Sequence, residues 1–410
     1  MAPLNVKPPP LSLEEYTARA LETDRFREDD DGLTQLSFGL FGEVGGLLAA
    51  VKKASRDTLQ KTKALVAGEE VGDALWYLAV LAHHGKATPN QVGEAAMATL
   101  REKLGEGPHR PNSTITFEEL DSLAELHHAS HLDKREMLLR ELAFDAGTIT
   151  QAPQVEYETW PAEKVASALG GLLGHLTLVA RSFGLDLASI ARENLAKIAD
   201  RWPGKQGPLP YVELFDAKGY LPHELLPRNE FKIDFIPRVV GGRDVIVQQW
   251  NGVNIGDPLT DNSNVVDWYR YHDVFHLAYM AHLGWSPVLR ALLKLKRKSN
   301  QAIDENEDGA RAIIMEEGIA TWIFNHAKER GDDFASVEVG KLDFALLKQV
   351  RTMVRGYEVH KCAPWQWEMA ILDGFKVFRE LKTAKAGSVI VNIEEHSIRF
   401  VGLQSLEGSA

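Results

Sequence analysis

The spacing of apolar residues changes character about halfway along this 410-residue chain. From residue 12 to about residue 202, apolar residues recur every three or four positions, as they do on one face of an α-helix. Farther on, FKIDFIPR at 231–238 and SVIVNIEEHSIRFVG at 388–402 alternate apolar and polar residues, as strands do, with helical patterns between them. The sequence therefore predicts a mainly α protein whose helical first half is followed by a separate α+β domain.

The helical first half divides at GEGPHRPNST, residues 105–114, where Gly and Pro stand in a polar setting. We therefore expect one helical domain over residues 12–105, a second over 115–204, and the α+β domain over 211–405. Within the α+β domain, Asn251-Gly252 is typical of a tight turn between two strands.

The two helical blocks resemble each other, which predicts an internal repeat. Residues 72–104 align without a gap with residues 170–202, and this alignment places Gly72 on Gly170. Few residues are identical, so a chance similarity between amphipathic helices is the alternative explanation.

Composition restricts the possible partners and metal sites. A formal net charge of -12 argues against binding to nucleic acid or anionic membranes, because clustered Lys and Arg hold such partners. Cys362 is the only cysteine, so any metal must be held by His, Asp or Glu. The sequence has no uncharged apolar run of about 18 residues and no signal-peptide pattern at its start. We therefore expect a cytoplasmic protein that is not bound to a membrane.

Acidic residues of the first block predict a metal site. Glu70 and Asp73 are three positions apart and so project from one face of a helix, and Glu43 lies on a preceding helix. If the three carboxylates meet, a hard cation such as Mg²⁺ or Mn²⁺ would relieve their mutual repulsion. The alternative is that they face solvent separately, as most helical Glu residues do.

The same residues carry a resemblance to a known family. LFGEVGGLLAAVKK at 40–53 and GEEVGDALWYLAVLA at 68–82 resemble the MazG nucleoside triphosphate pyrophosphohydrolases, all-α enzymes with Glu-x-x-Glu on one helix and Glu-x-x-Asp on the next. Glu43 matches the first acid of this signature, and Glu70 and Asp73 match the last two. The resemblance implies Mg²⁺ bound by these acids and cleavage of a nucleotide substrate between its α and β phosphates.

One acid of the family signature is missing. Gly46 stands where the family has its second Glu, so the site is expected either to bind metal more weakly or to bind nucleotide without cleaving it. In the second block, Ala168 and Gly171 align with the acids at 70 and 73, so that copy is expected to be inactive. It could instead form one wall of the pocket, which would make the chain an intrachain pseudo-dimer, with a homo-oligomer as the alternative.

Other residues near the signature are candidates for substrate binding. Trp76 or Tyr77 could stack on the base, and Lys52 or Lys53 could meet phosphate. Core packing for the aromatic residues and exposure to solvent for the lysines are the alternatives.

The last half contains a second candidate metal site. His272 and His276 are four positions apart, so they lie on one helical face, with Asp273 beside them. Glu316 and Glu317 interrupt an apolar pattern on another helix, where a buried acid needs a partner.

Together these residues resemble a ligand set for Zn²⁺, Mn²⁺ or Fe²⁺, which Glu358 and His360 could complete. The His-Asp pair is also similar to that of HD-type phosphohydrolases, which use it to hold metal. The alternative is a buried hydrogen-bond network that only orients the helices.

A second resemblance covers the last half. NIGDPLTDN at 254–262, YRYHDVFHLAY at 269–279 and AIIMEEGIA at 312–320 are similar to the extra C-terminal domain of a subset of MazG-like proteins. This resemblance implies no particular activity. Three functions therefore remain open: a nucleotide pyrophosphohydrolase, a nucleotide sensor that regulates the last domain, and a metal-dependent hydrolase in the last half.

Overall fold

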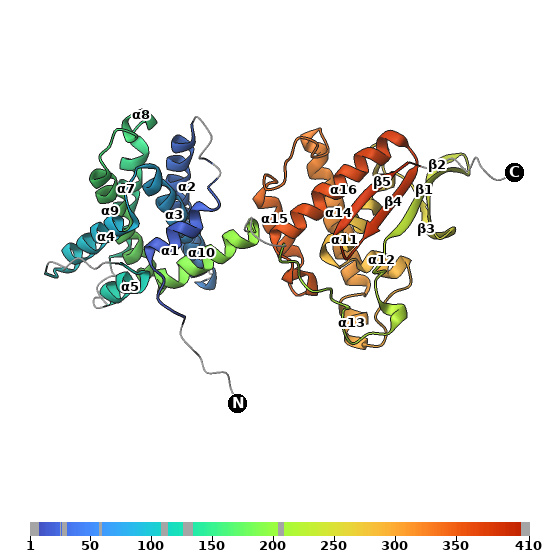
Figure 1. Ribbon diagram of the computed structural model, residues 1–410, viewed down its shortest axis with the longest axis horizontal. Helices are drawn as coiled ribbons and strands as arrows, with labels where there is room; N and C mark the ends of the chain where they lie inside the picture. Colours follow the sequence, from blue (N-terminus) through green and yellow to red (C-terminus); the bar gives the residue numbers. More distant parts are fainter. Residues whose placement is uncertain are drawn as a thin grey trace. The chain divides into compact units, whose positions relative to one another are not determined.

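The computed structural model describes residues 8–24, 26, 31–56, 60–107, 114–125, 134–203 and 209–402, with the side chains of 53–63 left out. It divides into two compact units, Met1–Ala199 and Asp200–Ala410. The first unit is helical, and the second combines helices with an antiparallel sheet (Figure 1). The predicted fold class, mainly α with an α+β second half, is therefore confirmed. The division of the helical half into two domains stays a prediction.

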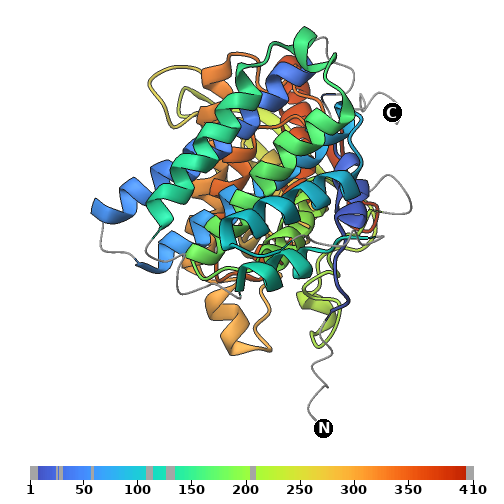
Figure 2. The same cartoon turned by 90° about the vertical axis from the view of Figure 1, so that its left-hand side faces the viewer.

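The first unit is built from helices that run side by side (Figure 1, Figure 2). Helix α2 packs against α3 and α7, and α9 packs against α4 and α7. Apolar residues on the inward faces of these helices form the core. The helices are α1 (Leu13–Leu21), α2 (Gly32–Arg56), α3 (Gln60–His84), α4 (Pro89–Leu104), α5 (Phe117–Glu125), α7 (Arg135–Gln151), α8 (Gln154–Tyr157), α9 (Ala162–Ser182) and α10 (Leu187–Arg201).

Helix boundaries follow the alignment of the predicted repeat. In that alignment His84, the last residue of α3, corresponds to Ser182, the last residue of α9. Pro89, the first residue of α4, corresponds to Leu187, the first residue of α10. The helix ends that flank the two turns therefore agree with the repeat hypothesis, whereas the first residues of α3 and α9, Gln60 and Ala162, are not aligned.

The aligned glycines Gly72 and Gly170 each allow a neighbouring helix to approach closely. A Cβ atom at Gly72 would lie 3.3 Å from side-chain atoms of Ile190 and Asn194 on α10, and one at Gly170 would lie 2.7 Å from the carbonyl oxygen of Val92 on α4. In the repeat alignment, Val92 corresponds to Ile190. Each glycine therefore faces the last helix of the other block, as the repeat hypothesis predicts, although the approach is closer at Gly170 than at Gly72.

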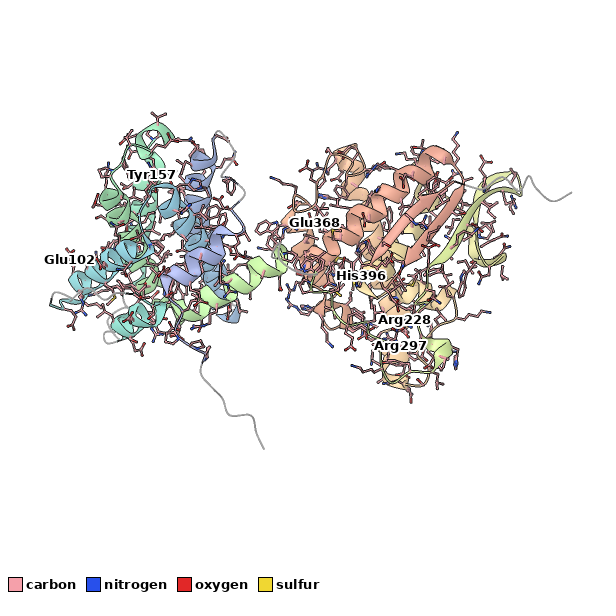
Figure 3. The ribbon with its side chains drawn as sticks, viewed as in Figure 1. Glu102, Tyr157, Arg228, Arg297, Glu368 and His396 are labelled. Atoms are coloured by element: carbon pink, nitrogen blue, oxygen red, sulfur yellow. The ribbon has the colours of Figure 1, made fainter. Side chains whose placement is uncertain are left out.

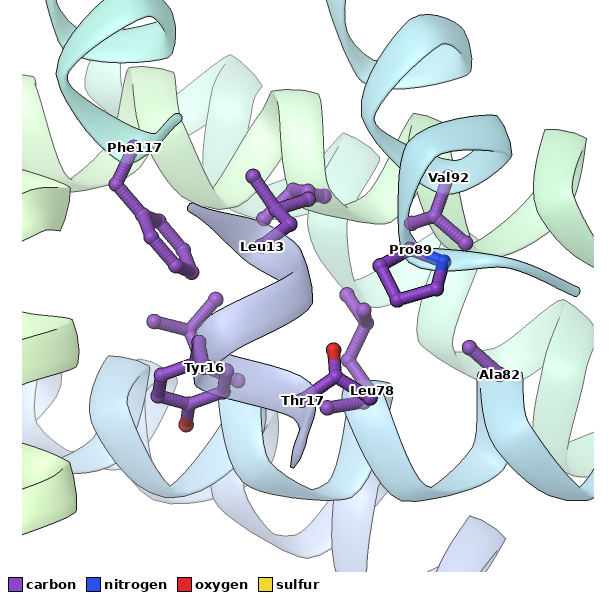
Figure 4. A pocket seen from close by; sticks show the side chains of 11 residues that line it. Leu13, Tyr16, Thr17, Leu78, Ala82, Pro89, Val92 and Phe117 are labelled. Carbon is purple, nitrogen blue, oxygen red and sulfur yellow. The ribbon is translucent and has the colours of Figure 1, made fainter. Parts of the chain in front are cut away.

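A small apolar cavity lies inside the first unit (Figure 4). It holds about 20 Å³ and is lined mainly by aliphatic and aromatic side chains, among them Leu13, Leu78 and Phe117. Pockets that bind small molecules usually hold about 300–1,000 Å³, so this cavity is a packing gap and cannot hold a nucleotide.

The second unit contains a five-stranded antiparallel sheet with strand order β3-β2-β1-β4-β5. Its strands are β1 (Phe231–Val240), β2 (Arg243–Trp250), β3 (Val253–Leu259), β4 (Gly387–Asn392) and β5 (Ser397–Val401). The predicted strands are confirmed. Asn251 and Gly252 both have positive φ angles, 52° and 74°, which is the conformation of the tight turn expected between β2 and β3.

Helices of the second unit cover one face of this sheet (Figure 1). Helices α11 and α16 contact β4 and β5 and also pack against each other. Alternate residues of β1, namely Phe231, Ile233 and Phe235, point into the shared core. The helices are α11 (Asp273–Leu283), α12 (Pro287–Leu292), α13 (Gln301–Asn306), α14 (Ala310–Arg330), α15 (Phe344–Met353) and α16 (Pro364–Ala384), with 3-10 turns η1 (Pro222–Glu224), η2 (Tyr269–Tyr271) and η3 (Glu358–Lys361).

Two helices of the described chain are long and apolar enough to cross a membrane by length and composition, Gly32–Lys52 and Ala162–Ser182. A core helix of a soluble protein meets the same criterion, and 78% of the Ala162–Ser182 window is buried against other helices of the first unit. The cytoplasmic location remains an expectation.

Candidate functional site

Three acidic side chains of the first unit converge between α2 and α3. Glu43 on α2 and Glu70 on α3 share a hydrogen bond, and Asp73 lies one turn farther along α3, close enough to act on the charge of Glu43. The geometry thus brings together the acids that the sequence singled out, because the spacing of three on α3 puts Glu70 and Asp73 on the face that meets α2.

The environment of Glu43 makes its ionisation unfavourable. Burial, the hydrogen bond with Glu70 and the negative charges of Asp73 and Glu70 together raise the pKa of Glu43 to about 8, although the positive charge of Lys197 opposes this. Burial and the charges of Glu43 and Asp73 also raise the pKa of the Tyr77 phenol. Carboxylates that lie close together repel one another, and the rest of the fold must hold them in place. Groups with such shifted pKa values are typical of functional sites.

Gly46 faces the same cluster. A Cβ atom at this position would lie 2.5 Å from Oε2 of Glu70, so the Glu70 carboxylate occupies the space where a side chain at position 46 would begin. The absence of a side chain at Gly46 is therefore part of how Glu70 is placed. A larger residue there requires the flexible Glu70 side chain to move.

Helix α10 supplies two residues to this site that the sequence analysis did not identify. The Lys197 ammonium donates to both carboxylate oxygens of Asp73, at 2.8 and 2.6 Å, and Asn194 Nδ2 donates to Asp73 Oδ1 at 3.1 Å. Asn194 also accepts a hydrogen bond from the buried hydroxyl of Tyr16 at 2.8 Å. The second helical block therefore forms a wall of the acidic site.

The other expected substrate-binding residues of the first unit lie in different surroundings. Trp76 is buried, and its indole N–H donates to the carbonyl oxygen of Ala20 and the hydroxyl of Thr23, which is the core-packing alternative. Lys52 is exposed on α2. The side chain of Lys53 lies outside the described residues.

A second polar cluster lies between α11 and α14 of the second unit. His272 precedes α11, His276 lies one turn farther on, and Glu317 faces both from α14. Oε2 of Glu317 is 3.8 Å from Nε2 of His272 and 3.5 Å from Nε2 of His276. The three residues each offer an atom, and these atoms all lie within 4.8 Å of one another, which suits a single metal ion.

The opposite nitrogen of each imidazole is held by an acceptor. Nδ1 of His272 lies 2.9 Å from the carbonyl oxygen of Tyr269, and Nδ1 of His276 lies 2.9 Å from Oε1 of Glu316. Because both acceptors require a proton on Nδ1, each ring is turned so that its Nε2 faces Glu317. Metal-bound histidines are usually oriented in this way.

Glu316 is a buried carboxylate that supports His276. It accepts hydrogen bonds from the hydroxyl of Ser286 at 2.7 Å and from the backbone N–H of Val288 at 2.8 Å, at the start of α12. Burial opposes protonation of His276, but the neighbouring charge of Glu316 outweighs it and raises the pKa of the imidazole well above its ordinary value. Glu316 thus contacts Nδ1 of His276, whereas Glu317 faces the Nε2 atoms of both histidines.

The sequence also placed Asp273, Glu358 and His360 at this site. Asp273 Oδ1 lies 3.0 Å from Nε2 of His272, and its other oxygen accepts from the amide of Gln248 at 2.6 Å. Glu358 accepts from the guanidinium of Arg297 instead of joining this cluster. His360 lies on η3 with Glu358, and within the described chain the metal-compatible group contains His272, His276 and Glu317 without it.

Residues 210–404 match the family model of the MazG C-terminal domain. This half of the chain is MazG-related. This match confirms the resemblance of the last half to the C-terminal domain of MazG-like proteins, whereas the tandem repeat and the pyrophosphohydrolase identity stay predictions. No curated protein and no solved structure matches the chain.

One of the two clusters lies within the residues that match the family model, and the other does not. His272, His276 and Glu317 lie within the matched residues, and Glu43, Glu70 and Asp73 lie before them. The match therefore does not include the acids of the first unit, and their resemblance to the family signature stays a prediction.

Proposed function

We propose that the first unit of this protein is a Mg²⁺-dependent or Mn²⁺-dependent nucleotide pyrophosphohydrolase, which cleaves nucleoside triphosphates or related nucleotides to the monophosphate and pyrophosphate. The observation that carries the proposal is the convergence of Glu43, Glu70 and Asp73, which raises the pKa of Glu43 to about 8. Carboxylates that the fold holds close together despite their mutual repulsion are suited to binding a divalent cation and the phosphates that accompany it.

The donor set fits Mg²⁺ or Mn²⁺. Both ions prefer oxygen ligands, and the three side chains offer carboxylate oxygens from two adjacent helices. When bound, the ion would neutralise phosphate oxygens and the charge that develops on them during cleavage. Glu43 would give up the proton that it holds near neutral pH.

The protein side chains have separate tasks in this proposal. Glu70, hydrogen-bonded to Glu43, is the carboxylate placed to orient an attacking water. Lys197 and Asn194 fix the orientation of Asp73. Lys197 also offers a positive charge to the polyphosphate, beside the acids and on a different helix from them.

The proposal is tested by incubating the full-length protein with each NTP and dNTP plus Mg²⁺ or Mn²⁺ and separating the products by chromatography. We expect monophosphate and pyrophosphate, and losses of at least about 100-fold in Glu70→Gln and Asp73→Asn. Glu102→Gln, an exposed acid on α4 (Figure 3), is the matched control and should behave as the parent. Absence of conversion, or turnover in Glu70→Gln equal to that of the parent, would refute the proposal.

A second candidate function is nucleotide sensing without cleavage, with the first unit regulating the second. Two observations favour it: Gly46 lacks the family carboxylate, and Lys197 already neutralises Asp73. Gly46→Glu is the discriminating variant. Because its Cβ would displace the Glu70 carboxylate, the new acid would join the cluster only after Glu70 shifts.

In the sensing function, the parent protein binds nucleotide in equilibrium dialysis without consuming it, and Gly46→Glu raises the affinity for Mn²⁺ or creates turnover. Turnover by the parent would exclude sensing without cleavage. No change in either property of Gly46→Glu would show that position 46 does not contribute to the site.

A further inference from the structure

The second unit contains a preorganised set of ligand atoms that the proposed function does not use. Nε2 of His276 is fully buried, and it has no hydrogen-bond partner within the described structure. Leaving a buried polar atom without a hydrogen-bond partner destabilises the fold, so its retention requires an explanation. This nitrogen faces the same space as Nε2 of His272 and Oε2 of Glu317.

The spacing of these atoms is that of ligands around one ion. Nitrogen and oxygen atoms bound at about 2.0–2.2 Å to the same ion lie roughly 3–3.6 Å from each other. Glu317 Oε2 lies 3.5 Å from one imidazole Nε2 and 3.8 Å from the other. A small inward movement of the Glu317 side chain would complete the arrangement.

Residues behind the ligands hold them in position. Tyr269 accepts from Nδ1 of His272 through its carbonyl oxygen and stacks its ring on the imidazole, with ring centres 4.3 Å apart. Glu316 holds Nδ1 of His276 and is itself held by Ser286. Such supporting contacts fix the tautomer and the direction of a metal ligand before the ion arrives.

The cluster carries excess negative charge. Asp273, Glu316 and Glu317 meet there, and in the described part of the chain their ion-pair partners are the two imidazoles. Three carboxylates therefore surround two imidazoles, an arrangement that a bound cation would stabilise.

We propose that His272, His276 and Glu317 bind one first-row transition-metal ion, such as Zn²⁺, Mn²⁺ or Fe²⁺. Imidazole nitrogens select these ions over Mg²⁺ and Ca²⁺. Glu317 is 39% exposed whereas the histidines are buried, so the centre opens to solvent on the Glu317 side. Three protein ligands with one open side form a catalytic type of centre, with Asp273 beside the ion.

This centre is independent of the acids of the first unit, and a cobalt titration distinguishes the two. The full-length protein is treated with a chelator, titrated with Co²⁺ and followed by its visible absorption, and the metal content after Zn²⁺ loading is measured by mass spectrometry. We expect one ion per chain at this centre, with the absorption of a low-coordinate nitrogen and oxygen site.

Variants assign the ion to the ligands. Glu317→Gln should weaken Co²⁺ binding at least tenfold and His276→Ala should abolish it, while Glu329→Gln, an exposed acid on the same helix, should bind as the parent. Glu70→Gln should also retain this absorption. His276→Ala removes a buried side chain. If that variant does not fold, the Co²⁺ affinity of Glu317→Gln alone tests the proposal.

Two results would overturn the proposal. One is a full-length protein that takes up no Co²⁺ or Zn²⁺ in stoichiometric amount, which would leave a closed hydrogen-bond network of protonated imidazoles. The other is binding that survives in Glu317→Gln and disappears in Glu70→Gln, which would place the ion at the first unit.

Discussion

The Lys197 ammonium lies 2.6 Å from Oδ2 of Asp73, although the two residues are 124 positions apart in the chain. This ion pair joins the second helical block to the acid signature of the first. In the repeat alignment the residue equivalent to Lys197 is Thr99, and the residue equivalent to Asp73 is Gly171. The aligned positions therefore contain neither the acid nor its cation, and within this alignment the ion pair occurs once.

Replacing Lys197 tests whether this cation competes with a divalent ion. Lys197→Met keeps most of the side-chain volume and removes the charge next to Asp73. We expect Mg²⁺ and Mn²⁺ to bind about 5–10 times more tightly, because nearby like charge opposes a bound cation by about 1 kcal/mol in a partly exposed site. Mn²⁺ binding measured by electron paramagnetic resonance would show this, and weaker binding would instead identify Lys197 as part of the support of the metal site. Lys103→Met, a partly exposed lysine of α4 paired with Glu141, is the control and should leave Mn²⁺ binding unchanged.

The contact between Gly170 and α4 predicts a stability difference between neighbouring glycines. A Cβ at Gly170 would lie 2.4 Å from Cβ of Ala95 and 2.7 Å from a backbone oxygen, so Gly170→Ala should destabilise the first unit by about 1–3 kcal/mol. Gly171→Ala meets nothing closer than 4.0 Å and should be neutral or stabilising by up to about 1 kcal/mol, because Ala favours the helix. Urea unfolding of both variants checks this. Equal effects would show that α4 and α9 adjust freely.

The Ser286 hydroxyl predicts a second stability effect, in the second unit. It donates to Glu316 and accepts from the backbone N–H of Leu289 as the N-cap of α12. Ser286→Ala should cost about 2–3 kcal/mol, because it removes a cap and leaves a buried carboxylate with one donor fewer. Ser12→Ala, which removes the N-cap of α1 on a more exposed surface, should cost about 1 kcal/mol. Thermal unfolding gives both values, and equal losses would show that Glu316 does not depend on Ser286.

The fold was predictable where local patterns decide it. The strands around Asn251-Gly252 and the helices of the first half follow the periodicity of their own residues. The meeting of Glu43 with Glu70 was predictable only through the family signature, because spacing along one helix says nothing about which neighbouring helix faces it.

The remaining parts of both sites depend on tertiary packing. Lys197 could have been found only by assuming that the two helical blocks pack against each other. Glu316 and Glu317 are adjacent in sequence and point about 100° apart around the helix, so the pattern could not tell which one faces the Nε2 atoms of the two histidines. The structure decides this through Ser286 and α12, which hold Glu316.

The buried ion pair between Asp216 and Arg290 predicts how the stability of the second unit depends on pH. Oδ2 of Asp216 accepts from Arg290 at 2.9 Å and from the backbone N–H of Leu226 at 2.7 Å. Burial opposes ionisation, but the charge of Arg290 and these hydrogen bonds outweigh it and lower the pKa of Asp216 below its ordinary value of 3.8. The folded protein therefore binds this proton less tightly than the unfolded chain does, and the stabilisation is complete above pH 3.8 and lost as the pH falls further.

Asp216→Asn should lower the free energy of unfolding at pH 7 by about 3–5 kcal/mol, because the buried guanidinium of Arg290 loses its hydrogen-bonded carboxylate and Arg228 loses the same partner, while Asp308 stays 3.8 Å from Arg290. The difference from the parent should shrink as the pH falls below 3.8, where the parent loses the same charge. Glu213→Gln removes one partner of an exposed pair with Lys218 and should change the free energy by less than about 1 kcal/mol at every pH. Urea unfolding followed by tryptophan fluorescence at pH 7 and near pH 3 measures both differences. A difference for Asp216→Asn that does not change with pH would mean that its cost comes from packing and hydrogen bonds, without a contribution from the carboxylate charge.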